Sequence, residues 1–336
     1  MKEAMFWEAQ GRRVVKCSLC SHRCRIAEGA RGLCGVRENQ DGKLYSLVYG
    51  RATAMAVDPI EKKPLYHFLP GTSSFSIATR GCNFRCIHCQ NCDISQPSAE
   101  EDFTEDQLLE PEQAVRMARA RGCASISYTY TEPTIFFEYA YDTARVARKR
   151  GLKNVFVTNG YITPEALQII QPCLDAANID LKSFRDKTYR KLCGARLQPV
   201  LEAIDLYYRL GIWIEITTLV IPGWNDSEDE LRDIAAFIAG LGREIPWHVS
   251  RFLPAYRMSG TRPTPVETLL TAYGIGKSAG LQYVYLGNVS HPSSAATMCP
   301  SCGRSVIDRN GLGAPVNALV KPVCPKCGYS IAGVWE

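Results

Sequence analysis

The chain has 336 residues and a formal net charge of +5; 46% of the residues are hydrophobic and 22% are charged. This composition can bury a sizeable core and excludes general disorder. No apolar run reaches transmembrane length and no apolar secretory signal opens the sequence, so we expect a cytoplasmic protein with no membrane contact. The basic excess is small, and it permits a nucleic-acid partner without indicating one.

Cysteine is the most informative residue type, with 15 copies. Twelve of them form three groups of four: Cys17, Cys20, Cys24 and Cys34; then Cys82, Cys86, Cys89 and Cys92; and finally Cys299, Cys302, Cys324 and Cys327. Cysteines at such short spacing, in a chain expected to stay in a reducing compartment, favour metal ligation over disulfides.

The distribution of cysteine, glycine and proline predicts three parts. Residues 1–70 form a cysteine-rich extension that we expect to bind metal, residues 71–290 form the central domain, and residues 291–336 form a small module. In the central domain, helical patterns alternate with strand-like runs over residues 75–79, 125–130, 154–158, 176–181, 213–220, 248–252 and 282–286. This alternation predicts an α/β fold of parallel βα units, as a doubly wound sheet or as a full or partial barrel. Both topologies bind ligands at the C-terminal ends of their strands.

The central cysteines follow the first of these strands directly. Cys82, Cys86 and Cys89 have the spacing C-x3-C-x2-C, and three thiolates from one loop can hold three corners of a 4Fe–4S cluster. The fourth iron then stays open to a substrate. The alternative is a zinc loop completed by Cys92 or His88. We interpret Cys92 as a spare thiol, because a fourth protein ligand would close the site.

With this cysteine run, residues 71–290 resemble the radical S-adenosylmethionine (SAM) enzymes, and most of all the branch of the pyruvate formate-lyase activating enzymes. The resemblance implies a partial (β/α)6-type TIM barrel, a 4Fe–4S cluster on the three cysteines and SAM on the open iron. It implies that one electron, from a flavodoxin- or ferredoxin-like reductant, cleaves SAM to methionine and a 5′-deoxyadenosyl radical. This radical then removes a hydrogen atom from a substrate.

The resemblance also implies contacts for SAM at later strand ends. In SYTYTEPT, Thr131 and Glu132 would hold the methionine amino group, and in NIDLKSF, Lys182 would pair with the SAM carboxylate beside Asp180. The further cofactor contacts that it implies are His88, which would lie beside the adenine, Asn159, His248 and Asn288. The structural alternatives are a helix cap for the first pair, a surface ion pair for the second, a turn at Asn159 and a buried structural histidine at His248.

The two ends carry the other cysteine groups. Cys299, Cys302, Cys324 and Cys327 form two knuckles with zinc-ribbon or rubredoxin-like spacing, which predicts a zinc ion that holds a small module together. Cys17, Cys20, Cys24 and Cys34 could hold a second zinc ion or an auxiliary iron–sulfur cluster that relays electrons, with His22 as an alternative ligand.

The whole chain resembles the radical SAM member of the AmmeMemoRadiSam system, which implies Memo-type and AMMECR-type partner proteins by association. We therefore expect a radical SAM enzyme that acts on a protein partner, in the manner of glycyl-radical activation. One alternative is radical SAM modification of RNA. Another is a non-catalytic, zinc-binding scaffold for nucleic acid or protein.

Overall fold

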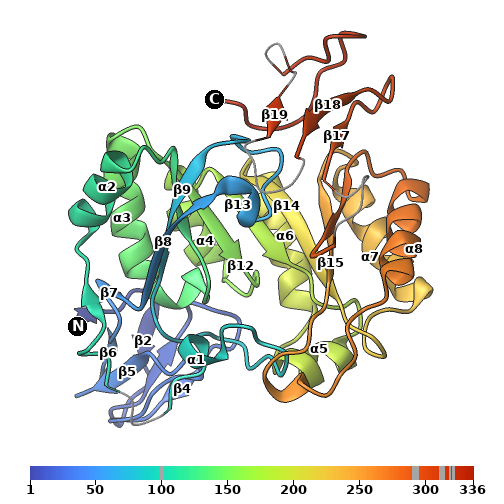
Figure 1. Ribbon diagram of the computed structural model, residues 1–336. Helices are drawn as coiled ribbons and strands as arrows, with labels where there is room; N and C mark the ends of the chain where they lie inside the picture. Colours follow the sequence, from blue (N-terminus) through green and yellow to red (C-terminus); the bar gives the residue numbers. More distant parts are fainter. Residues whose placement is uncertain (99–101, 290–294, 310–314, 318, 320–321) are drawn as a thin grey trace.

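The computed structural model describes residues 1–98, 102–289, 295–309, 315–317, 319 and 322–336. Its centre is an eight-stranded sheet with the strand order β16–β15–β14–β13–β12–β11–β9–β8 (Figure 1). The parallel strands are β9 (Ser73–Ala78), β11 (Ser125–Tyr128), β12 (Lys153–Thr158), β13 (Ala176–Asp180), β14 (Trp213–Val220), β15 (Trp247–Arg251) and β16 (Val284–Gly287). An antiparallel edge strand, β8 (Ala54–Pro59), pairs with β9.

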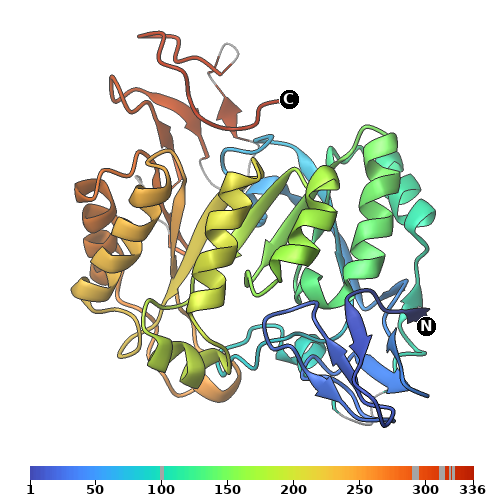
Figure 2. The same cartoon turned by 180° about the vertical axis from the view of Figure 1, so that it is seen from behind.

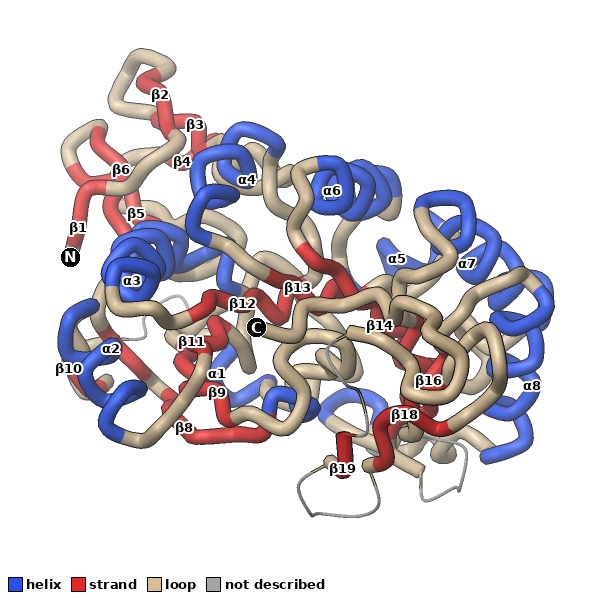
Figure 3. Tube along the Cα trace, turned by 90° about the horizontal axis from the view of Figure 1, so that it is seen from above, coloured by secondary structure: helices blue, strands red, loops and turns tan. Residues whose placement is uncertain are grey.

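The order of the parallel strands decides between the two expected topologies. They follow one another in chain order from β9 to β16, whereas a doubly wound sheet reverses its order at a switch point. The sheet is therefore an open, partial barrel, as the resemblance predicts. Its covering helices are α2 (Pro111–Ala120), α3 (Phe137–Lys149), α4 (Pro164–Ile170), α6 (Gln198–Arg209), α7 (Glu228–Leu241) and α8 (Val266–Ser278). They lie along one face of the sheet (Figure 2) and on the outer side of its arc (Figure 3).

Local sequence signals explain the elements that shape this barrel. Ile126, Phe156 and Ile216 lie on three of the parallel strands and are fully buried, which fits strands covered on both faces. Helix α7 begins after Ser227, whose hydroxyl accepts from the backbone N–H of Glu230. A shorter helix, α5 (Asp186–Cys193), ends at Gly194 with φ +70°.

The part of the N-terminal extension that precedes β8 packs at the end of the barrel where the parallel strands terminate (Figure 1). It has two small sheets: β1 (Lys2–Glu3), β6 (Lys43–Ser46) and β5 (Arg37–Gln40); and β2 (Trp7–Ala9), β3 (Val15–Cys17) and β4 (Arg25–Ile26). Its buried residues share one apolar core with the barrel. The buried Arg37 guanidinium donates to both carboxylate oxygens of Glu138 in α3 at 3.0 Å, which ties the extension to the barrel. A short pair, β7 (Arg51–Ala52) with β10 (Gln107–Leu108), adds a further link.

The C-terminal module lies at the opposite end of the barrel (Figure 1). Its strands are β17 (Thr297–Met298), β18 (Ser305–Asp308) and β19 (Val316–Asn317). The imidazole of His67, on the segment before β9, is bonded to the Ala332 carbonyl at 2.7 Å and to the Tyr285 hydroxyl at 2.6 Å. This segment therefore joins the module to the barrel. In the described part of the chain, we find no helix with the length and apolar character needed to cross a membrane.

Candidate functional site

The cysteine loop between β9 and the short helix α1 (Cys92–Ser95) is held in place by backbone hydrogen bonds at both ends. Gly81 N–H donates to the Ile94 carbonyl at 2.9 Å, and Arg85 N–H donates to the Cys193 carbonyl at 2.8 Å. Cys92 is the first residue of α1 and so follows the loop. The loop is thus anchored both to the helix that follows it and to the end of α5.

The three loop cysteines lie close enough to influence one another. Burial raises the pKa of the Cys82 thiol, and the neighbouring Glu132, Cys86 and Cys89 raise it further. Phe84 N–H donates to Cys82 Sγ at 3.3 Å, as a backbone group does for a sulfur ligand. Thiolates gathered in this way repel one another unless a cationic group lies between them. The donor set of three cysteines on one loop therefore fits a 4Fe–4S cluster.

Glu132, after β11, fixes two neighbouring strand ends. Its buried carboxylate accepts from Thr134 N–H at 3.0 Å, the Thr134 hydroxyl at 2.6 Å, the Thr158 hydroxyl at 2.7 Å and Asn159 N–H at 2.8 Å. Burial raises the pKa of Glu132, and these donors oppose that effect. Glu132 thus caps the short 3-10 helix Pro133–Phe136, while the Thr131 hydroxyl donates to the Thr79 carbonyl at 2.8 Å instead.

Asn159, after β12, connects this arrangement to the cysteine loop. Its side-chain amide donates to Asn83 Oδ1 at 2.7 Å and lies 3.8 Å from Cys82 Sγ. Its own Oδ1 accepts from Tyr161 N–H at 3.0 Å, which is the turn role expected of an Asn-Gly pair. Both interpretations of Asn159, as a turn residue and as a residue beside the cluster, thus agree with its position.

Lys182 follows β13 and forms an ion pair, at 2.9 Å, with Asp180, the last residue of that strand. The Lys182 side chain is 15% exposed and the Asp180 side chain is 32% exposed, so the pair is partly buried. Although burial opposes it, Asp180 and the thiols of Cys86 and Cys193 raise the pKa of Lys182 well above its ordinary value. The ammonium therefore stays charged and faces the cysteine loop. This is the position that the resemblance assigns to a partner for a carboxylate.

His88, in the cysteine loop, is buried beside the same ammonium. Burial and the Lys182 charge lower the pKa of His88 to about 3, so its ring is neutral. Among the residues that the structure describes, its Nδ1 has no hydrogen-bond partner. A buried polar atom without a partner needs a ligand or water to satisfy it.

The structure does not bring His248 and Asn288 into this group. Nε2 of the buried His248 lies 2.6 Å from Glu215 Oε2, and Glu215 also accepts from His67 N–H at 2.8 Å. His248 therefore belongs to the buried network that joins the barrel to the C-terminal module, which is the structural alternative for this residue. Asn288 Nδ2, beyond β16, donates to the Arg251 carbonyl at 3.1 Å.

The four C-terminal cysteines come together. Their sulfur atoms all lie within 4.8 Å of one another, with 3.6 Å between Cys299 and Cys327 and 3.7 Å between Cys302 and Cys324. Zinc–sulfur bonds of about 2.3 Å in a tetrahedron place sulfur atoms about 3.8 Å apart. These cysteines therefore have the spacing of a structural zinc site.

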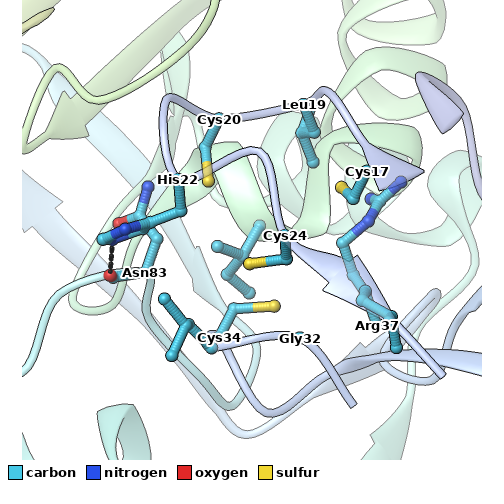
Figure 4. A pocket seen from close by; sticks show the side chains of 12 residues that line it. Cys17, Leu19, Cys20, His22, Cys24, Gly32, Cys34, Arg37 and Asn83 are labelled. Atoms are coloured by element: carbon cyan, nitrogen blue, oxygen red, sulfur yellow. Dashed lines mark hydrogen bonds between the residues drawn. The ribbon is translucent and has the colours of Figure 1, made fainter. Parts of the chain in front are cut away.

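The four N-terminal cysteines, which we call the N-terminal quartet, line a pocket beside the cysteine loop (Figure 4). Nε2 of His22, between the second and third of them, lies 2.8 Å from the Asn83 carbonyl oxygen. Sequence analysis predicted this group but not its position. It also missed the places of Asn83 and Cys193, although Asn83 lies within the C-x3-C spacing and Cys193 precedes a helix-ending glycine.

Comparison with known proteins identifies the family to which the chain belongs. Residues 76–237 match the model of the radical SAM superfamily. A protein of Methanocaldococcus jannaschii, MJ0808, is 46% identical over 335 residues, which cover 98% of this chain and 99% of the relative. The chain belongs to the radical SAM superfamily. Its members are enzymes that use an iron–sulfur cluster and SAM.

The chain is also similar to one more distant relative and to one solved structure. The pyruvate formate-lyase 1-activating enzyme of Escherichia coli K12 is 22% identical over 219 residues, which cover 61% of this chain and 89% of that enzyme. The structure of a radical SAM methyltransferase from Sphaerobacter thermophilus matches with a TM-score of 0.50 and 17% identity, covering 68% of this chain and 71% of that one. The latter similarity supports the fold of this radical SAM chain.

Proposed function

We propose that this radical SAM enzyme acts on a partner protein, and that its reaction is of the glycyl-radical activation type. The observation that carries the radical SAM part of the proposal is the position of the Lys182 ammonium, half-buried near the Cys86 thiol of the cysteine loop. Among the relatives, the pyruvate formate-lyase 1-activating enzyme has, by its name, a protein as its target. This similarity supports a protein substrate.

The cysteine loop would hold the cofactor of this reaction. Cys82, Cys86 and Cys89 would be the ligands of a 4Fe–4S cluster with one open iron. When bound, the cluster supplies the electron that cleaves the sulfonium bond of SAM and so yields methionine and a 5′-deoxyadenosyl radical. The remaining steps of binding and orientation fall to side chains of the barrel.

Each end of the SAM methionine would have a partner of opposite charge at the strand ends. Lys182 would bind the carboxylate, and Asp180, at 2.9 Å from the ammonium, would orient it. Glu132 would attract the amino group, while its four hydrogen bonds keep its carboxylate fixed. Thr131 lies at the same strand end as Glu132 and donates to the Thr79 carbonyl. Asn159 connects the neighbouring strand end to the cysteine loop through its hydrogen bond to Asn83.

The neutral ring of His88 would lie against the adenine. Because the Lys182 charge and burial keep His88 unprotonated, the ring adds no second positive charge near the sulfonium. Its unpartnered Nδ1 would accept a hydrogen bond from an adenine amino group or from water. His88 would therefore hold the base in place without taking part in proton transfer.

Partners of the proposed reaction are a reductant and the target protein. A flavodoxin- or ferredoxin-like protein would supply electrons, and Memo-type and AMMECR-type proteins are the candidate targets by association. We also infer that the four C-terminal cysteines hold zinc, because of their tetrahedral sulfur spacing. This ion would stabilise the module at the far end of the barrel.

The test is formation of 5′-deoxyadenosine by anaerobically reconstituted protein with SAM and dithionite. We expect the wild-type chain to form it and the Cys86→Ala variant to form none, with Cys123→Ala as a matched control that keeps the activity. Adding a deuterated candidate partner protein then tests the substrate class, because hydrogen abstraction transfers deuterium to 5′-deoxyadenosine. Absence of deuterium transfer from every candidate partner would contradict the proposed class of target.

A further inference from the structure

We propose that the N-terminal quartet holds a second iron–sulfur cluster, next to the cysteine loop, rather than a zinc ion. The inference goes beyond the proposed function, which needs one cluster only. It depends on the environment of the quartet, on the spacing of its sulfur atoms and on its contacts with the cysteine loop.

The quartet surrounds a mostly apolar pocket. Cys17 comes from β3, Cys20 and Cys24 from the turn that follows it, and Cys34 from the turn before β5 (Figure 4). Leu19, Ile26 and Ile135 are the buried apolar side chains on the pocket wall. Four thiols that line a mostly apolar pocket form a donor set suited to a soft metal centre.

The backbone around these thiols has the form that sulfur ligands take. His22 N–H is hydrogen-bonded to Cys20, and Val36 N–H is hydrogen-bonded to Cys34. Both donors are two residues beyond their cysteine, as Phe84 is beyond Cys82 in the cysteine loop. Two of the four cysteines therefore share this local turn with Cys82 in the loop whose family binds a cluster.

The spacing of the sulfur atoms distinguishes a cluster from a zinc ion. Throughout the described ranges, the C-terminal cysteines are the only group of three or more potential ligands whose ligand atoms all lie within 4.8 Å. The N-terminal quartet is wider than that, and so is the trio of the cysteine loop. A cube of four iron atoms is larger than one ion, so its thiolates stand further apart. The quartet thus resembles the cluster-binding trio rather than the zinc-like group.

The side chain of Arg37 also indicates a ligand in this pocket. Its side chain is 2% exposed and lines the same pocket. Its terminal nitrogens are bonded to Glu138 and to the Met5 carbonyl, but its Nε has no partner among the residues described. A buried N–H donor beside Cys17 and Cys34 can donate to a thiolate or to a cluster sulfide.

The quartet touches the cysteine loop directly. A Cβ atom at Gly81 would lie 2.8 Å from the Cys34 carbonyl oxygen, so the two segments are in backbone contact. Arg85 also donates to the Leu33 carbonyl, and His22 contacts the Asn83 carbonyl at 2.8 Å. The second cluster would therefore be a direct neighbour of the first.

Metal analysis of a full-length variant that lacks the loop trio (Cys82→Ala, Cys86→Ala, Cys89→Ala) tests the proposal. After anaerobic reconstitution we expect about four iron atoms, about four sulfides and about one zinc per chain. The reduced variant should show an iron–sulfur EPR signal that SAM does not change. A chain with no iron and about two zinc ions would overturn the proposal.

A second comparison starts from the wild-type chain. The double variant Cys20→Ala, Cys24→Ala should lose about half of about eight iron atoms and keep its zinc. The matched control Cys123→Ala, Cys173→Ala changes two cysteines outside the three groups and should keep all of its iron. Loss of zinc instead of iron in the double variant would overturn the proposal.

These outcomes separate the proposal from the proposed function. Wild-type protein that forms 5′-deoxyadenosine with about four iron atoms and about two zinc ions overturns only the second cluster. In the opposite case, the variant without the loop trio keeps its iron while the wild-type chain forms no 5′-deoxyadenosine. That result supports the second cluster and overturns only the proposed function.

Discussion

Gly81 packs so closely against Cys34 that a side chain at position 81 would collide with it. A Cβ atom there would lie 2.8 Å from the Cys34 carbonyl oxygen and 2.6 Å from Val36 Cγ1, and Gly81 has φ +96°. This contact joins the N-terminal extension to the cysteine loop. It makes the extension part of the wall around the site.

Replacing Gly81 by alanine should therefore weaken both the fold and the site. We expect Gly81→Ala to lower the free energy of unfolding by about 1–3 kcal/mol, because neither neighbour is the far end of a flexible side chain. The matched control is Gly122→Ala, where φ is +66° and the described structure leaves the space open within 4 Å. Urea unfolding of both variants measures the difference. Equal loss in the two variants would contradict the close contact.

Lys182 should control the affinity for SAM. Replacing it by glutamine removes the half-buried ammonium while leaving the cysteine ligands unchanged. A charged hydrogen bond contributes about 1.5–3 kcal/mol, so we expect binding that is weaker by at least about tenfold. Lys153→Gln is the matched control, since its ammonium pairs with Asp175 at 3.6 Å near the surface. Equilibrium dialysis with labelled SAM, at matched iron content, checks this; unchanged affinity in Lys182→Gln would refute the assigned role.

The stability of the fold should depend on pH through the protonation of His67. Burial lowers the pKa of His67 to about 4, from an ordinary value of 6.5. The unfolded chain then binds the proton more readily, so stability is complete above pH 6.5 and falls as the pH drops toward 4. Between pH 7 and pH 5, the wild-type chain should lose about 2 kcal/mol more than His67→Gln. Urea unfolding at both pH values measures this, and parallel losses in the two proteins would show that His67 is not buried in neutral form.

The C-terminal cysteines should stabilise the module without serving the chemistry. Cys299→Ala should lose its zinc but keep its iron and still form 5′-deoxyadenosine, because the module lies at the end of the barrel away from the cysteine loop. Zinc and iron content, together with the product assay, check the prediction. Loss of iron in this variant would contradict the separation of the two sites.

The parts of this architecture that follow local rules could be predicted. Alternation of apolar runs with amphipathic segments predicted the parallel strands, and residues 154–158 and 213–220 form β12 and β14 within one residue of those bounds. The cysteine spacing predicted the loop at the end of β9. Asp180 and Lys182 were predicted beside it from the family resemblance, because they close a parallel strand whose C-terminal end lies at the same edge of the sheet.

Contacts between distant segments could not be predicted. A histidine in a strand is equally suited to a ligand site and to a buried network, and His248 is fixed by Glu215 on the neighbouring strand. The contact of Gly81 with Cys34 depends on how the N-terminal extension folds back on the barrel. Neither relation has a local signal, because each depends on segments that the sequence places more than 30 residues apart.

The central claim is that SAM binds the open iron of a cluster on Cys82, Cys86 and Cys89. Electron–nuclear double resonance of the reduced protein, with SAM labelled by 15N at its amino group, tests this claim most directly. We predict a 15N coupling to the cluster in the wild-type chain and its loss in Cys86→Ala. A reduced cluster whose spectrum SAM leaves unchanged would contradict the account.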